Sequence, residues 1–142
     1  MCKLSIITIN YNNAEGLVKT LKSVLNQTCT AFEHIIVDGA STDNAVEIIQ
    51  QYEADATARG IKVVWISEKD KGIYNAMNKG IKMANGKYIQ ILNSGDCLAA
   101  DTVVNDMFVT LNEKAFPEIL YGNMLKTVDW KTYQRDNCRA NS

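Results

Sequence analysis

The chain has 142 residues and a mass of 15.8 kDa, and 46% of its residues are hydrophobic and 22% charged, as is typical of one globular domain. Lys and Arg number 15 against 16 Asp and Glu, so the chain lacks the basic surplus of a nucleic-acid-binding protein. No apolar run approaches the roughly 20 residues that span a bilayer, and no secretion signal is recognisable at the start, so a cytoplasmic location is expected.

The cysteines and the single histidine do not form a recognisable site. No CxxC pair occurs, and no cysteine has a neighbouring histidine, which excludes the usual zinc and thioredoxin-type motifs. We expect reduced thiols at all four cysteines and a structural or surface role for His34. The cysteines are Cys2, Cys29, Cys97 and Cys138.

Strand and helix patterns alternate from the start of the chain. Residues 3–9 are rich in β-branched side chains and predict a buried strand. Apolar residues at helical spacing follow, with Asn12 or Asn13 as the cap, and a second strand is predicted over residues 34–37. The remaining expected elements are a helix capped by Ser41 or Thr42, a strand at 61–67, a helix at 73–84, a strand at 88–92, a helix at 103–111 and a strand at 119–121.

This alternation predicts an α/β fold in which a doubly wound, mostly parallel sheet carries helices on both faces. Ligands of such sheets bind beyond the carboxyl ends of the strands, where the strand order reverses. The loops of interest therefore begin at Asn10, Asp38, Glu68 and Asn93.

Three of these loops carry carboxylates, at Asp38, at Glu68 and Asp70, and at Asp96. Asp, Asn, Ser and Gly also favour turns and helix caps, which explains any single loop without a ligand. Three acidic loops at one edge would need a compensating cation or a hydrogen-bonding ligand, and Mg²⁺ or Mn²⁺ in turn favours a phosphorylated ligand. The sequence has neither GxGxxG after the first strand nor GxxxxGK[ST], so a glycine cradle for the phosphates is not expected.

Four motifs resemble those of family 2 glycosyltransferases of the GT-A fold. They occur in the family's order and read SIITINYN at 5–12, IVDGASTD at 36–43, GIYNAMNKG at 72–80 and LNSGD at 92–96. The resemblance covers about residues 3 to 123 and is strongest to the bacterial branch that builds capsular, exopolysaccharide or lipopolysaccharide chains. It implies a nucleotide-sugar-binding domain over residues 1–123 and a partial or irregular segment over 124–142.

The resemblance implies roles for the nucleotide-binding residues. Tyr11 would stack on the nucleotide base and Asp38 would accept the uracil imide N–H, while Asn10 and Asn93 join them as donor-binding candidates. A half-buried core tyrosine and a helix-capping aspartate are the structural alternatives for Tyr11 and Asp38.

The resemblance also implies a divalent metal, Mn²⁺ or Mg²⁺, held by Asp96 and bridging the donor diphosphate. Asp70 would accept a sugar hydroxyl, and Lys71 would contact a phosphate. A solvated charge cluster is the alternative for this loop. Many relatives carry Arg where Met77 stands, so a bidentate phosphate contact is lost at that position.

The implied reaction is inverting transfer of a sugar from a nucleotide-diphosphate donor, expected to be a UDP-sugar, to a saccharide or lipid-linked acceptor. The catalytic base is expected to lie outside this chain, so a noncatalytic nucleotide-sugar-binding module, or an inactive truncated glycosyltransferase, is the alternative. Two further alternatives are peripheral association with the inner face of the plasma membrane and self-association through the truncated edge. The sequence reveals no basic amphipathic helix that would favour membrane association.

Overall fold

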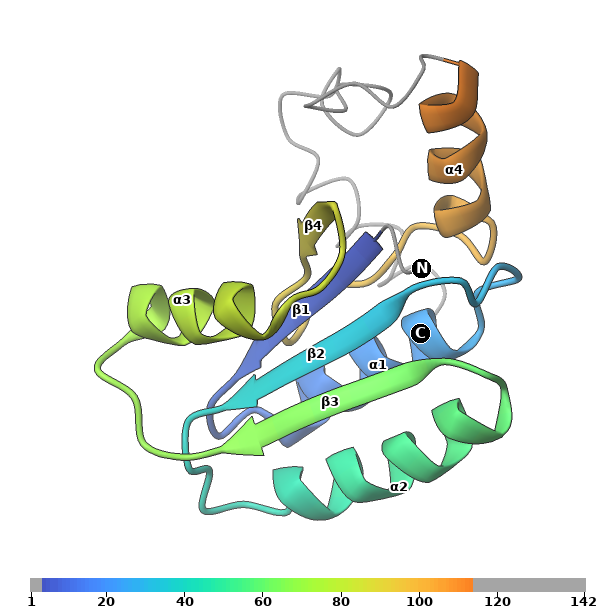
Figure 1. Cartoon of the computed structure of the whole chain (residues 1–142). Coiled ribbons are helices and arrows are strands. Elements are labelled where there is room, and N and C mark those ends of the chain that lie inside the picture. Colours follow the sequence, from blue (N-terminus) through green and yellow to red (C-terminus); the bar gives the residue numbers. More distant parts are fainter. Residues whose placement is uncertain (1–3, 114–142) are drawn as a thin grey trace.

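A computed structural model describes residues 4–113 as four strands alternating with four helices (Figure 1). The predicted strand at 119–121 and the expected domain boundary at residue 123 lie outside this range. The elements, in chain order, are β1 (Leu4–Asn10), α1 (Ala14–Leu25), β2 (Glu33–Asp38), α2 (Ala45–Ala58), β3 (Lys62–Ser67), α3 (Ile73–Met83), β4 (Tyr88–Ile91) and α4 (Val103–Glu113).

The four strands form one parallel sheet in the order β3-β2-β1-β4. The pairing aligns Asn10 of β1 with Asp38 of β2, and Asp38 with Ser67 of β3. Strands β2 and β3 follow one another on one side of β1, and β4 pairs with the other side of β1. The strand order therefore reverses between β1 and β4, and the expected doubly wound arrangement is confirmed for these residues.

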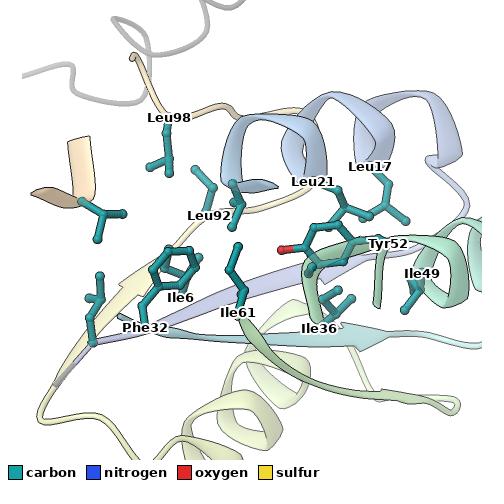
Figure 2. Packing of buried hydrophobic residues seen from close by; sticks show 14 of the residues in the cluster. Ile6, Leu17, Leu21, Phe32, Ile36, Ile49, Tyr52, Ile61, Leu92 and Leu98 are labelled. Carbon is teal, nitrogen blue, oxygen red and sulfur yellow. The ribbon is translucent and has the colours of Figure 1, made fainter. Parts of the chain in front are cut away.

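The two faces of the sheet are covered by different helices. Ile6 and Ile36 pack with α1, α2 and α4 in the larger cluster, part of which is drawn in Figure 2. Ile7 and Ile35 face the opposite way and pack with Ala76 of α3. The central strands are buried on both faces, as a parallel sheet between helices requires.

One of the two predicted helix caps is correct. Asn13 caps α1, because its side-chain oxygen accepts a hydrogen bond from the Gly16 N–H at 3.2 Å. Neither Ser41 nor Thr42 caps α2, which begins only at Ala45. Both hydroxyl residues instead bond across the sheet edge to the loop after β1.

His34 has the structural role expected of it. It is fully buried, with Nε2 2.7 Å from the Thr8 hydroxyl and Nδ1 2.6 Å from the Tyr52 hydroxyl. Burial lowers its pKa to about 3, so the ring stays neutral near pH 7. The expectation of four reduced thiols is wrong for Cys97, which is disulfide-bonded, while Cys29 is free. Sequence spacing does not report which thiols the fold brings together.

None of the helices between residues 4 and 113 combines the length and the apolar character needed to cross a bilayer. Both outer strands, β3 and β4, pair on one side only within the described sheet. The expected self-association through the sheet edge stays a prediction.

Candidate functional site

A pocket of about 360 Å³ lies at the carboxyl ends of β1 and β4, where the strand order reverses. Four of the seven predicted site residues line it, whereas Asp38, Lys71 and Asp96 do not. The lining residues are Ile9, Asn10, Tyr11, Asn13, Asp70, Gly72, Ile73, Ala76, Asn93 and Ser94.

Asn10 joins the loops on either side of β1. Its side-chain N–H donates to Asp38 Oδ1 at 2.9 Å, and its Oδ1 accepts a hydrogen bond from the Ser94 hydroxyl at 2.7 Å. The side chain is almost completely buried. Asn10 therefore sets the separation of the β2 and β4 loops and forms part of the pocket floor.

Asp38 is fully buried and does not line the pocket. Its Oδ1 accepts hydrogen bonds from Asn10 Nδ2 and the Ser41 hydroxyl, and its Oδ2 accepts from the Ser41 N–H and the Ser67 hydroxyl, at 2.7 to 2.9 Å. Burial alone would raise the pKa of Asp38, but the bonds from Ser41, Asn10 and Ser67 outweigh it and hold the pKa below its usual value. The carboxylate is thus ionised and saturated by protein donors, which differs from the direct base contact implied by the family resemblance.

Tyr11 and Asp70 meet over the bare backbone of Gly39. A Cβ atom at Gly39 would lie 3.0 Å from Asp70 Oδ2 and 3.3 Å from Tyr11 Cδ1, so both side chains pack closely against this glycine. The Tyr11 side chain is 64% exposed beside the pocket. An aromatic face and a carboxylate are therefore presented side by side. Sequence reasoning missed Gly39, whose only signal is its place directly after the strand.

The charged loop before α3 is held by its own backbone and by the helix. Asp70 Oδ1 accepts from the Gly72 N–H at 3.2 Å, and Gly72 has a φ of 121°, a conformation that favours glycine. Lys79 reaches back from α3, with its Nζ 3.4 Å from Glu68 Oε1. Lys71 is exposed and does not line the pocket. Sequence reasoning missed the part that Lys79 plays in ordering this loop.

The turn after β4 is anchored to α1 by the buried Thr20. The Thr20 hydroxyl accepts from the Gly95 N–H at 2.9 Å and lies 2.6 Å from the Asp96 carbonyl oxygen. Asn93 Oδ1 is buried and has no hydrogen-bond partner within the described part of the chain. An unsatisfied oxygen at a pocket wall is free to bind a donor or a cation.

The described loops do not assemble a metal-binding carboxylate cluster. Residues 4–113 contain no group of three or more His, Cys, Asp or Glu side chains that could hold an ion. The loops after β1, β3 and β4 do meet at the pocket, but their carboxylates do not gather into a group of three within this range. The Asp96 carboxylate and the unsatisfied Asn93 oxygen are donors of the type that Mg²⁺ or Mn²⁺ prefers.

Comparison with known proteins identifies the family. The model of glycosyl transferase family 2 matches residues 5–136. The chain belongs to this family. It is 36% identical over 120 residues to an uncharacterized glycosyltransferase of Mycobacterium tuberculosis, covering 84% of this chain and 44% of that protein. It is also 38% identical over 100 residues to an Escherichia coli chondroitin synthase, covering 70% of this chain and 14% of that protein.

Solved structures show the same fold. Staphylococcus aureus TarS, in complex with UDP-GlcNAc, superposes with a TM-score of 0.68 at 26% identity, covering 78% of this chain and 31% of that one. The mannosyltransferase PcManGT of Pyrobaculum calidifontis, in complex with GDP-Man and Mn²⁺, superposes with a TM-score of 0.68 at 20% identity, covering 77% and 32%. The expected GT-A fold is thus confirmed, and the chain spans less than half of the matched curated relatives.

Proposed function

We propose that this chain forms the donor-binding part of a glycosyltransferase that transfers a sugar from a UDP-sugar. The observation that carries the proposal is the pocket at the reversal of strand order, where Tyr11, Asp70 and Asn93 converge. UDP-GlcNAc in the TarS complex supports a UDP-sugar, since that protein shares the fold. A saccharide or lipid-linked acceptor is proposed from the resemblance to polysaccharide-building relatives.

The exposed Tyr11 ring is the surface on which the base would stack. Base stacking on an aromatic side chain contributes about 1–3 kcal/mol. Asp70 packs on Gly39 as the ring does and lines the pocket, so we assign it the acceptor of an N–H or hydroxyl from the ligand. We assign Asp38 an indirect role, because its carboxylate orients Asn10 and Ser41 beneath the ligand rather than contacting the ligand itself.

A divalent ion, Mg²⁺ or Mn²⁺, fits beside the turn after β4. Asp96 and the unsatisfied Asn93 oxygen would hold it, with the donor diphosphate supplying further ligands. Such an ion withdraws electron density from the departing diphosphate. Lys71 is exposed near the entrance and stays a proposed phosphate contact.

Titration of UDP by calorimetry tests the proposal, with and without Mn²⁺. We expect Tyr11→Ala to weaken UDP binding by about tenfold or more, through loss of base stacking. Tyr74→Ala is the matched control, because Tyr74 is 79% exposed on α3 and does not line the pocket. Absence of UDP binding at millimolar concentration, or equal losses in the two variants, would refute the proposed site.

The metal assignment has its own test. Asp96→Asn should abolish the gain in UDP affinity on adding Mn²⁺ while leaving metal-free binding in place. Asp101→Asn, which changes an exposed aspartate outside the pocket, is the control. An unchanged Mn²⁺ effect in Asp96→Asn would show that other groups hold the ion.

Nucleotide-sugar binding without catalysis is the second candidate function. Asp70 is the one carboxylate among the residues that line the pocket, and it already accepts a hydrogen bond from the Gly72 N–H. A spare general base is therefore not present in that lining. UDP release from UDP-GlcNAc with a saccharide acceptor would favour the enzyme, whereas tight binding without turnover would favour the binding module.

A further inference from the structure

Charge is distributed unevenly between the two faces of the sheet. Residues 68–87, which include α3, contain five Lys and two acidic residues, and Lys79 pairs with Glu68. Residues 43–58, which include α2, contain four Asp or Glu and no Lys or Arg. The helices α3 and α2 lie on opposite faces of the sheet (Figure 1). A chain with a net charge of −1 thus has one locally basic face.

The basic face also exposes large apolar side chains. Ile73, Tyr74 and Ile81 of α3 are 50%, 79% and 46% exposed. At 100° per residue, these positions fall within an arc of about 100° on one side of the helix. Exposed Lys82 lies about 80° beyond this arc, and we call these four residues the α3 surface. Helix α3 is therefore more basic and amphipathic than sequence reasoning recognised.

The apolar area extends from the helix onto the sheet. Ile89 of β4 is 42% exposed and lies two residues before Ile91, which packs with the α3-side cluster. Because side chains alternate along a strand, Ile89 is directed to the same face as α3. Apolar side chains and lysines thus share one face of the molecule.

We propose that the α3 surface binds anionic lipid membranes. Lysines near an anionic leaflet each contribute favourable electrostatic attraction, and exposed Ile and Tyr side chains can enter the headgroup region. The acidic α2 face would be repelled by the same leaflet, so binding has a single favoured orientation. This complementarity of charge selects an anionic lipid surface over a neutral apolar partner.

The orientation has a consequence for the pocket, which rests on the proposed function. Gly72, Ile73 and Ala76 at the start of α3 line the pocket. With the α3 surface against the membrane, the pocket lies beside the lipid headgroups. That position suits transfer to an acceptor attached to a lipid.

Cosedimentation of the full chain with vesicles tests the proposal. We expect binding to vesicles of phosphatidylglycerol and phosphatidylcholine, little binding to phosphatidylcholine alone, and weaker binding as salt rises from about 0.1 M to about 1 M. The double variant Ile81→Ser/Lys82→Glu should lower the partition coefficient by at least about tenfold, because it reverses one charge and removes an apolar contact.

The chain offers a matched control on the opposite face. Val18 and Lys19 form the same apolar–lysine pair on α1, and Val18 is 46% exposed, as Ile81 is. Val18→Ser/Lys19→Glu should bind the vesicles as the unaltered chain does. Melting temperatures and UDP titrations of both variants separate a membrane effect from unfolding and from failure of the proposed nucleotide site.

Equal losses in the two double variants, or equal binding to neutral and anionic vesicles, would overturn the proposal. A concentration-dependent dimer in lipid-free solution that only the α3 variant abolishes, without vesicle binding, would assign the surface to a second copy of the chain instead. Lys82→Arg should keep the binding, because it preserves the charge.

Discussion

The two ends of strand β2 each hold a buried carboxylate, but the two are bonded differently. Asp38, at the carboxyl end, accepts four hydrogen bonds shared between both oxygens. Glu33, at the amino end, accepts from the Ser5 hydroxyl at 2.5 Å and the Asn85 N–H at 2.6 Å, both on Oε2. Its Oε1 has no hydrogen-bond partner among residues 4–113, although Lys62 Nζ lies 4.0 Å away.

The two carboxylates differ in how completely they are hydrogen-bonded and in which parts of the fold their donors connect. Both carboxylates keep a pKa below the usual value, because hydrogen bonds outweigh the opposing effect of burial. Only Asp38 is saturated, and its donors come from three separate strands or loops that support the pocket. The Glu33 network instead ties the segment before β4 to the amino ends of β1 and β2.

The largest effect is expected from Asp38→Asn. The new amide places an N–H₂ group where donors already point, so buried donors lose their acceptor and the loops separate. We expect a loss of about 3 kcal/mol in the free energy of unfolding, measured by urea denaturation, together with weaker UDP binding. If Asp38→Asn lowered the free energy of unfolding no more than Glu33→Gln does, the two carboxylates would not differ in their contribution to stability.

A smaller, pH-dependent effect is expected from His34, which lies next to Glu33 on β2. Its folded pKa of about 3 lies below its ordinary 6.5, so the unfolded state binds more protons between these values. Stability is therefore full above pH 6.5 and falls by about 1.4 kcal/mol per pH unit below it.

Urea unfolding at pH 7 and pH 5 measures this slope. The variant His34→Gln, which retains polar groups for Thr8 and Tyr52, should lose most of the pH dependence in that interval. Because Asp38 and Glu33 have depressed pKa values, their contributions should decline only at lower pH, below about 4. An unchanged slope in the variant would exclude His34 as the titrating group.

The smallest effect is expected from Glu33→Gln. Its amide N–H₂ can take the place of the unsatisfied Oε1, while the remaining oxygen still accepts from Ser5 and Asn85. We expect a loss below about 1 kcal/mol in urea denaturation and no change in UDP affinity. A change in UDP affinity would show that the two ends of β2 are coupled.

Much of the fold was predictable from local patterns. The strand expected at 3–9 is observed at Leu4–Asn10, and the helix expected at 73–84 is observed at Ile73–Met83. Apolar periodicity reports these elements because burial of one face follows directly from residue spacing. The cap of α2 was not predictable, since Ser41 and Thr42 bond to Asn12, a partner about 30 residues away.

The candidate site was predictable in place but not in detail. Tyr11, Asp70 and Asn93 follow three different strands, and the parallel sheet brings them to one pocket, as the loop positions predicted. The burial of Asp38 could not be predicted from the sequence, because an aspartate at the end of a strand can face either solvent or neighbouring side chains. Gly39 gained its importance only from the Tyr11 and Asp70 side chains packed against it.

The sequence by itself determined the alternation of strands and helices, the parallel sheet and the loops that could form a site, because each follows from residue type and spacing along the chain. Tertiary structure alone decided that Asp38 faces inward and is saturated, that residues 4–113 form no metal-binding group of three carboxylates, and that Ile81 and Lys82 lie on an exposed basic face. These outcomes depend on side chains brought together from distant positions, which spacing does not encode.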